Sequence, residues 1–190
     1  MFFLSRILYD MKIIHSVFPT PFGWCGIVKG EAGLVRIFLP EPEKSSVDRK
    51  IKLFYPLSVF SKGSFSNEIR EFERYFAGSK PHFSFTLDFS GSTLFQTMVW
   101  SEAGKIPYGE VKTYGWIAER IGKPRAVRAV GNTLGRNPFP IIIPCHRVIR
   151  ESGEPGGFST PVGTELKAKL LQLERVRFKF GVQSSECAME

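Results

Sequence analysis

The stretch TYGWIAERIGKPRAVRAVG, residues 113–131, carries the signals of two short helices joined by a tight turn. Thr113 can cap a helix over residues 114–121, because its hydroxyl oxygen can accept a hydrogen bond from the first turn, and Gly122 ends that helix. Pro124 suits the first position of a second helix, which runs to about Leu134. This spacing predicts a helix-turn-helix.

The second of these helices is basic and has a small-residue surface. Arg125 and Arg128 lie three residues apart, and Ala126, Ala129 and Gly131 are small enough for the backbone to approach a groove closely. Such a helix could fit DNA, with its arginines reaching phosphates or the base stack. The alternative is a buried helix whose arginines merely reach solvent.

The rest of the chain predicts an α/β (α+β) fold in two domains. Apolar runs at 13–17, 24–28 and 34–39 predict an antiparallel meander, followed by a polar loop at 40–50, a helix at 67–77 and an alternating strand at 83–89. Further helices are expected at 93–104 and 164–175, and a short strand or extended run at 141–143. The predicted divisions are an extension (1–10), an N-terminal domain (11–90), a C-terminal domain (91–181) and a tail (182–190).

The formal net charge of +8 is concentrated in one region. Residues 105–150 contain nine basic side chains and only two acidic ones. That distribution permits nucleic acid or another anionic partner, and an ordinary solvated basic face is the alternative. The sequence contains no run of about 18 apolar residues that would predict a membrane span. Its first residues resemble a signal peptide only faintly, because Arg6 breaks the apolar run, the start is not basic and no small-residue cleavage site follows.

The cysteines argue against a disulfide scaffold and a zinc site. Cys25, Cys145 and Cys187 are scattered, with no paired Cys-x-x-Cys spacing and no nearby histidine set that would hold zinc. We therefore expect no metal, no cofactor and a reducing compartment, either the cytoplasm or, in a eukaryote, the nucleus. We also expect a monomer.

Pro144, Cys145 and His146 come directly after three isoleucines. A cysteine nucleophile reacts as a thiolate, so it needs a nearby proton acceptor, which His146 can supply. Adjacent residues on a strand point to opposite faces, so the backbone must turn at Cys145 or a water must bridge the two side chains. The alternative is a buried structural thiol.

Together these residues resemble a known family. NPFPIIIPCHRV, residues 137–148, is similar to the active-site signature of the O6-alkylguanine-DNA alkyltransferases, also called methylated-DNA–protein-cysteine methyltransferases. The segments 94–100, 106–110, 125–131 and 156–158 match the family in order and spacing. The resemblance is strong over residues 92–174 and only general over 12–90. It implies a ribonuclease H-like N-terminal domain and a winged helix-turn-helix in the C-terminal domain.

The resemblance implies a DNA repair protein that acts once. It transfers the alkyl group of O6-alkylguanine, with O4-alkylthymine as a further candidate substrate, irreversibly to Cys145. His146 would act as base through a bridging water, Glu174 would orient His146, Tyr114 would donate to the departing guanine, and Asn137 would brace the turn.

The family also implies a duplex DNA partner whose damaged nucleotide is flipped out of the stack. Arg128 would fill the vacated place, from a helix lying in the minor groove. The implied DNA-binding residues are Arg128, Arg125, Tyr114, Thr113, Ala126, Ala129, Gly131 and Arg136. The implied substrate pocket comprises Tyr114, Met98, Trp100, Pro140, Pro155, Gly156, Gly157, Phe158, Ser159 and Lys167.

Two other function classes remain open on the sequence. A non-catalytic lesion sensor or transcription regulator would bind DNA without transfer, although sensors of this kind replace the nucleophilic cysteine. A cysteine hydrolase would need an oxyanion-hole motif, which the sequence does not offer.

Overall fold

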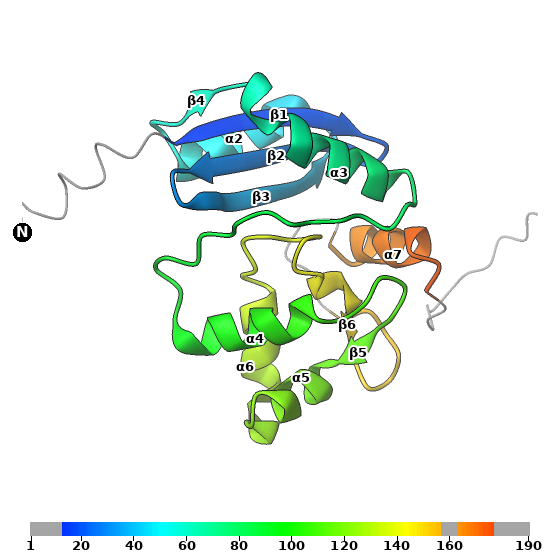
Figure 1. The fold of residues 1–190 in the computed structure, drawn as a ribbon. Coiled ribbons are helices and arrows are strands. Elements are labelled where there is room, and N and C mark those ends of the chain that lie inside the picture. The colour runs from blue at the N-terminus through cyan, green and yellow to red at the C-terminus, as the bar shows by residue number, and fades with distance from the viewer. Residues whose placement is uncertain (1–12, 157–162, 177–190) are drawn as a thin grey trace, which may run out of the picture. The chain divides into compact units, whose positions relative to one another are not determined.

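A computed structural model describes residues 13–156 and 163–176 (Figure 1). The chain divides into two compact units. One runs to Thr97 and includes Asn137–Ile143, and the other comprises Met98–Arg136 and the chain from Pro144 onward. The domain boundary predicted between residues 90 and 91 stays a prediction.

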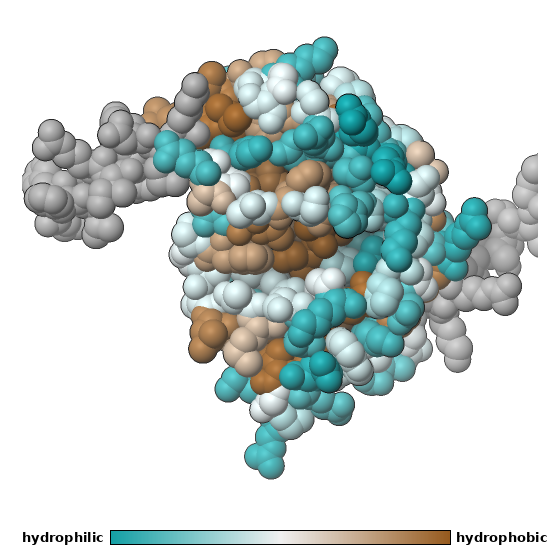
Figure 2. Space-filling model, in the orientation of Figure 1, coloured by the Kyte–Doolittle hydropathy of each residue, from teal (hydrophilic) through white to brown (hydrophobic). Residues whose placement is uncertain are grey.

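The first unit is built on a four-stranded sheet. Strands β1 (Ile14–Thr20), β2 (Gly23–Gly30) and β3 (Gly33–Glu41) form an antiparallel meander, which confirms the three predicted strands. The short β4 (Val59–Phe60) pairs in parallel with β1, so the strand order is β3-β2-β1-β4. Figure 2 shows apolar side chains at the surface over β4.

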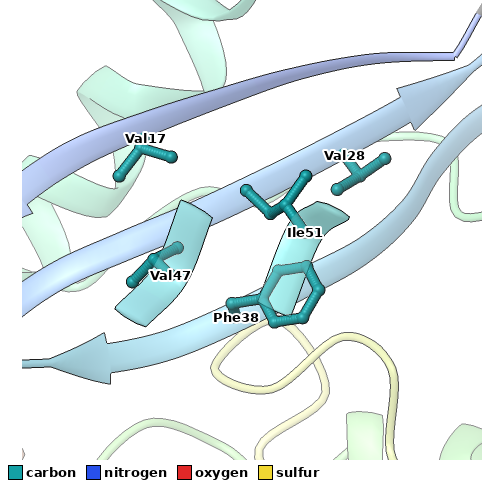
Figure 3. Close-up of a cluster of buried hydrophobic side chains, with 5 residues drawn as sticks. All are labelled: Val17, Val28, Phe38, Val47 and Ile51. Carbon is teal, nitrogen blue, oxygen red and sulfur yellow. The ribbon is translucent and has the colours of Figure 1, made fainter. Parts of the chain in front are cut away.

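Two helices cover opposite faces of this sheet: α2 (Lys44–Phe54) and, after the 3-10 turn η1 (Gly63–Phe65), α3 (Ser66–Phe76) (Figure 1). Strand residues Val17, Val28 and Phe38 form one buried cluster with Val47 and Ile51 of α2 (Figure 3). The neighbouring strand residue Phe18 packs on Phe72 of α3, with ring centroids 5.7 Å apart. This alternation follows from the two-residue period of a strand.

The predicted polar loop at residues 40–50 is wrong, because α2 begins at Lys44. Only Val47 and Ile51 of α2 are buried, so its apolar stripe consists of two residues one turn apart among charged neighbours. The predicted strand at 83–89 is also wrong. That segment forms only an isolated parallel bridge, between Leu87 and Leu34, although Phe83, Phe85 and Leu87 are half-buried in alternation with exposed residues.

The second unit contains the predicted helix-turn-helix. Its elements are α5 (Tyr114–Arg120), the 3-10 turn η2 (Pro124–Ala126) and α6 (Val127–Leu134). Thr113 caps α5 by accepting a hydrogen bond of 3.1 Å from the Trp116 backbone, and Pro124 lies at the start of η2, as predicted. The predicted helices at 93–104 and 164–175 correspond to α4 (Leu94–Gly104) and α7 (Gly163–Leu173).

A small parallel sheet connects the helix-turn-helix with the cysteine segment. Strand β5 (Lys112–Thr113) pairs with β6 (Val148–Ile149), and the 3-10 turn η3 (Cys145–Arg147) directly precedes β6. None of the helices in residues 13–156 and 163–176 has the length and apolar character that crossing a bilayer requires.

Candidate active site

The backbone turns at Cys145, which is one of the two arrangements that allow Cys145 and His146 to cooperate. Pro144 precedes the single 3-10 turn of η3, so the segment leaves the extended conformation at the cysteine. All three residues of η3 are buried, and Cys145 retains 7% of its surface exposed. The cysteine is therefore largely shielded from solvent.

Glu174 links the two residues that follow the cysteine. Its Oε1 lies 2.7 Å from His146 Nε2, and both side chains are inaccessible to solvent. The Arg147 guanidinium donates to both carboxylate oxygens of Glu174, at 2.7 Å and 3.0 Å. Arg147 also donates to the Ile106 carbonyl at 2.7 Å, so this buried charge is paired.

The electrostatics of this cluster favour a neutral imidazole next to a carboxylate. Burial lowers the pKa of His146, and its hydrogen bond with Glu174 opposes that shift. Burial raises the pKa of Glu174, but hydrogen bonds from His146 and Arg147 outweigh it and lower the value to about 2. Because a carboxylate can only accept, it holds the proton on His146 Nε2 and leaves Nδ1 as the basic nitrogen.

The half-buried Tyr114 and the buried Lys167 form a second pair. Lys167 Nζ donates to the Val148 carbonyl at 2.6 Å, lies 3.4 Å from Tyr114 Oη and sits 5.6 Å from the centre of the tyrosine ring. Burial lowers the pKa of Lys167 to about 8, while a negative charge on Cys145 opposes that shift. Burial, followed by the charge of Cys145, raises the pKa of Tyr114. Lys167 and Tyr114 are therefore both within electrostatic range of the thiolate.

Gly156 leaves room for the tyrosine hydroxyl. Its φ of +71° is a conformation that favours glycine, and a Cβ at this position would lie 2.8 Å from Tyr114 Oη. Any larger residue at position 156 would displace the Tyr114 side chain, the backbone at position 156 or both.

Asn137 braces the turn that leads to Pro144. Its Nδ2 donates to the Ile143 carbonyl at 2.8 Å, and its Oδ1 accepts from the Phe139 backbone at 2.9 Å. Within this turn, the buried Ile141 has a φ of +77°, which is costly for a β-branched residue. The extended run expected at 141–143 is thus a turn at Ile141 and Ile142, closed by a bridge between Pro140 and Ile143.

The residues predicted to bind DNA lie on and around the helix-turn-helix. Arg125, Arg128 and Ala129 are exposed, and so is Arg136 beyond the end of α6. Buried Val130, Thr133 and Leu134 form the opposite face of α6. Four further predicted residues are half-buried: Thr113, Tyr114, Ala126 and Gly131.

The predicted pocket residues differ in burial and in the unit to which they belong. Trp100 is buried, and its indole donates to the Thr133 carbonyl at 3.0 Å, which ties α4 to α6. Met98 is half-buried, Pro155 is buried, and Pro140 belongs to the first unit. Gly157, Phe158 and Ser159 lie outside the described residues.

The sequence did not indicate which residues hold Glu174. Besides Arg147, the Gly109 backbone donates to Glu174 Oε2 at 3.2 Å, and Tyr108 Oη donates to the Leu173 carbonyl at 3.2 Å. Tyr108 and Gly109 lie in the segment 106–110, whose match to the family was the signal in the sequence that could have indicated them.

In residues 13–156 and 163–176, no three His, Cys, Asp or Glu side chains are close enough to hold a metal ion. Burial raises the pKa of Cys25, which leaves that thiol inert.

Comparison with family models matches both parts of the chain. Residues 13–89 match the ribonuclease-like domain of 6-O-methylguanine DNA methyltransferase, and residues 94–176 match its DNA binding domain.

Solved structures share this fold. Mycobacterium tuberculosis O6-methylguanine methyltransferase aligns with a TM-score of 0.71 and 35% identity, covering 86% of this chain and 93% of that one. A structure of Mycobacterium tuberculosis OGT in complex with DNA aligns with a TM-score of 0.70 and 36% identity, covering 85% of this chain and 92% of that one.

Curated relatives extend over most of the sequence. The methylated-DNA–protein-cysteine methyltransferase of Methanosarcina acetivorans is 39% identical over 161 residues, which are 84% of this chain and 97% of the relative. The constitutive enzyme of that name from Bacillus subtilis is 37% identical over 169 residues, 87% of this chain and 97% of the relative. The match over nearly the full length of both relatives means that this chain belongs to the methylated-DNA–protein-cysteine methyltransferase family.

Proposed function

We propose that this protein repairs DNA by transferring the alkyl group of O6-alkylguanine to its own Cys145, once per molecule. The observation that carries this proposal is the buried hydrogen bond of 2.7 Å between Glu174 and His146, the residue that directly follows Cys145. Family membership supports the reaction, and the match to a relative solved in complex with DNA supports the substrate.

The reaction is a displacement at the alkyl carbon. The thiol proton passes to His146 Nδ1, through a bridging water, and Glu174 stabilises the resulting imidazolium. The Cys145 thiolate attacks the alkyl carbon, a carbon–sulfur bond forms, and the bond from that carbon to guanine O6 breaks. The electron pair stays on guanine, which receives a proton or a hydrogen bond from Tyr114. The thioether product is stable, so the protein is consumed.

Lys167 supports two steps of this reaction. Its ammonium next to Tyr114 Oη favours proton donation from the hydroxyl to the departing base. The same positive charge favours the thiolate form of Cys145. Gly156 leaves room for the tyrosine hydroxyl, and Asn137 holds the turn before the cysteine.

The exposed arginines of the helix-turn-helix engage the DNA. We propose that α6 enters the minor groove and that Arg128 replaces the flipped nucleotide in the base stack. Arg125 and Arg136 bind phosphates, while Ala126, Ala129 and Gly131 allow a close approach. Because the acceptor must be a reduced thiol, we place this activity in the cytoplasm or, in a eukaryote, in the nucleus.

The test is transfer of a labelled alkyl group. The full chain is incubated with duplex DNA that carries one labelled O6-methylguanine, and digested protein is analysed by mass spectrometry. We expect one methyl group per molecule, on the peptide that contains Cys145, and none on Cys145→Ala. Tight lesion binding by the wild-type protein without transfer would instead identify a sensor, a class that the presence of Cys145 does not favour.

A further inference from the structure

Exposed apolar side chains gather at one place on the first unit. Seven large apolar residues are exposed in the described part of the chain, and five of them fall within residues 53–60. Their exposed fractions run from 53% to 76%. We call this group the β4 patch: Leu53, Phe54, Leu57, Val59 and Phe60. Exposed apolar side chains this close together in the chain mark a site that another segment or molecule covers.

The β4 patch is held in place by its neighbours. The Phe54 ring packs on Phe38, with centroids 6.1 Å apart, and the Arg36 guanidinium lies 4.7 Å from its centre. The Phe60 ring meets the His15 ring edge-on at 5.9 Å. These contacts fix the aromatic residues of the patch in exposed positions, so the patch is a preformed surface.

The patch also contains an open sheet edge. Strand β4 is last in the order β3-β2-β1-β4, so among the described strands it pairs with β1 alone. Both residues of β4 are exposed, and Figure 2 shows apolar side chains over this strand. An apolar edge strand invites pairing with another chain unless something covers it.

The chain itself supplies a segment of matching chemistry at this edge. The Val59 backbone donates to the Ile13 carbonyl at 3.0 Å, so the residue that follows position 12 is bonded to the patch. Eight of residues 1–12 are apolar: Met1, Phe2, Phe3, Leu4, Ile7, Leu8, Tyr9 and Met11. A twelve-residue segment can span up to about 40 Å, which is enough to cross five side chains. Attachment next to the patch also gives the segment a local concentration of the order of millimolar.

We propose that residues 1–12 pack on the β4 patch of the same chain and cover its edge strand. This cover is separate from alkyl transfer, because no residue of the β4 patch belongs to the proposed reaction or DNA-binding sites. Its effect is to keep a sheet edge from pairing between molecules, so the expected monomer depends on these twelve residues.

Limited trypsin digestion of the full chain tests the proposal. The site to follow is the bond after Arg6, because the bond after Lys12 adjoins Ile13 and β1 and would be protected without docking. We expect cleavage there to be at least about tenfold slower than in a synthetic peptide of residues 1–14, because a docked segment must first open. The double variant Leu53→Ser/Leu57→Ser should bring the rate close to that of the peptide.

The experiment has a matched control, and two outcomes would overturn the proposal. Leu94 is 78% exposed and lies outside the patch, so Leu94→Ser should leave the cleavage rate unchanged. Alkyl transfer at the wild-type rate shows that each variant is folded. Cleavage as fast as in the peptide would overturn the proposal. A full-length dimer in light scattering that Leu53→Ser/Leu57→Ser dissociates would also overturn it, because a second copy would then occupy the patch.

Discussion

The carboxylate of Glu174 binds both the imidazole of His146 and the guanidinium of Arg147. Its two oxygens bind His146 and Arg147, and all three side chains are buried. The carboxylate thus sets the tautomer of His146, and Arg147 keeps the carboxylate ionised. The family resemblance indicates Glu174 from the sequence, whereas the part played by Arg147 is visible only in the structure.

Glu174→Gln should slow alkyl transfer by about 10²-fold, because the amide cannot stabilise a charged imidazolium as a carboxylate does. DNA affinity should change little, since Glu174 is buried away from solvent. Single-turnover rates and equilibrium binding separate the two effects. Because the substitution leaves Arg147 without its charge partner, circular dichroism must first show a folded variant. A large loss of DNA affinity in folded protein would contradict the role of Glu174.

Arg128→Ala should impair repair of duplex DNA by about 10²-fold at saturating DNA, because flipping costs a few kcal/mol that the inserted side chain offsets. Reaction with a free O6-alkylguanine base should change little. Arg125→Ala is the matched control, since it removes an equally exposed charge from the same surface without the stacking role. Equal losses on duplex and free base would argue against insertion of Arg128.

At the scale of elements, local signals predict the helix-turn-helix. Thr113 and Pro124 mark the helix-turn-helix in the sequence, and both occupy the expected positions. Helix α2 was not predicted because only two of its residues, Val47 and Ile51, are buried. They are buried by packing on the sheet, which the local sequence does not reveal. The turn at Ile141 escapes it because a β-branched residue rarely adopts a positive φ.

Gly26→Ala should destabilise the first unit by about 1–3 kcal/mol, because α2 packs directly on this glycine. A Cβ there would lie 2.6 Å from Val47 Cγ1 and 3.1 Å from Ile51 Cδ1. Gly63→Ala is the control, since a Cβ at Gly63 meets nothing within 4 Å. Urea unfolding measures the difference in free energy. Equal midpoints for the two variants would mean that α2 shifts to accommodate the methyl group.

At the scale of the whole molecule, folding brings some basic residues of 105–150 into ion pairs and leaves others exposed. Arg147 is buried against Glu174, and Lys105, Lys112, Arg120 and Arg150 each form an ion pair. Four remain exposed and form no ion pair with a described residue: Lys123, Arg125, Arg128 and Arg136. The charge available to DNA is therefore smaller than the sequence count indicates, and it lies on and around the helix-turn-helix.

DNA affinity should fall steeply with added salt, because each neutralised phosphate releases condensed counterions. Arg136→Ala should reduce the slope of log affinity against log salt concentration by about one. Lys62→Ala, an exposed charge in the first unit, should leave the slope unchanged. Fluorescence anisotropy with undamaged duplex measures both slopes. The same loss of slope in both variants would mean that the DNA contact is not confined to the second unit.

Stability should decrease as the pH falls below neutrality. Burial lowers the pKa of His146 below 6.5, and the hydrogen bonds of Glu174 lower its pKa from 4.5 to about 2. Below 6.5, and further below 4.5, the unfolded chain therefore binds protons that the folded protein does not. Stability present at neutral pH is lost progressively, the Glu174 part between about 4.5 and about 2. Urea midpoints at decreasing pH test this, and a constant midpoint as the pH falls through 4.5 would contradict it.

The sequence by itself determined the helix-turn-helix, the three-stranded meander and the position of the reactive cysteine. Caps, helix-starting prolines and apolar periodicity act between neighbours, so they can be recognised without knowing the fold. Only the tertiary structure decided which charges are buried and paired. Glu174 lies 28 residues beyond His146, and Lys167 lies 53 residues beyond Tyr114, so their contacts depend on how α7 packs. A buried charge is stable only next to its partner, and that pairing is a property of the folded chain.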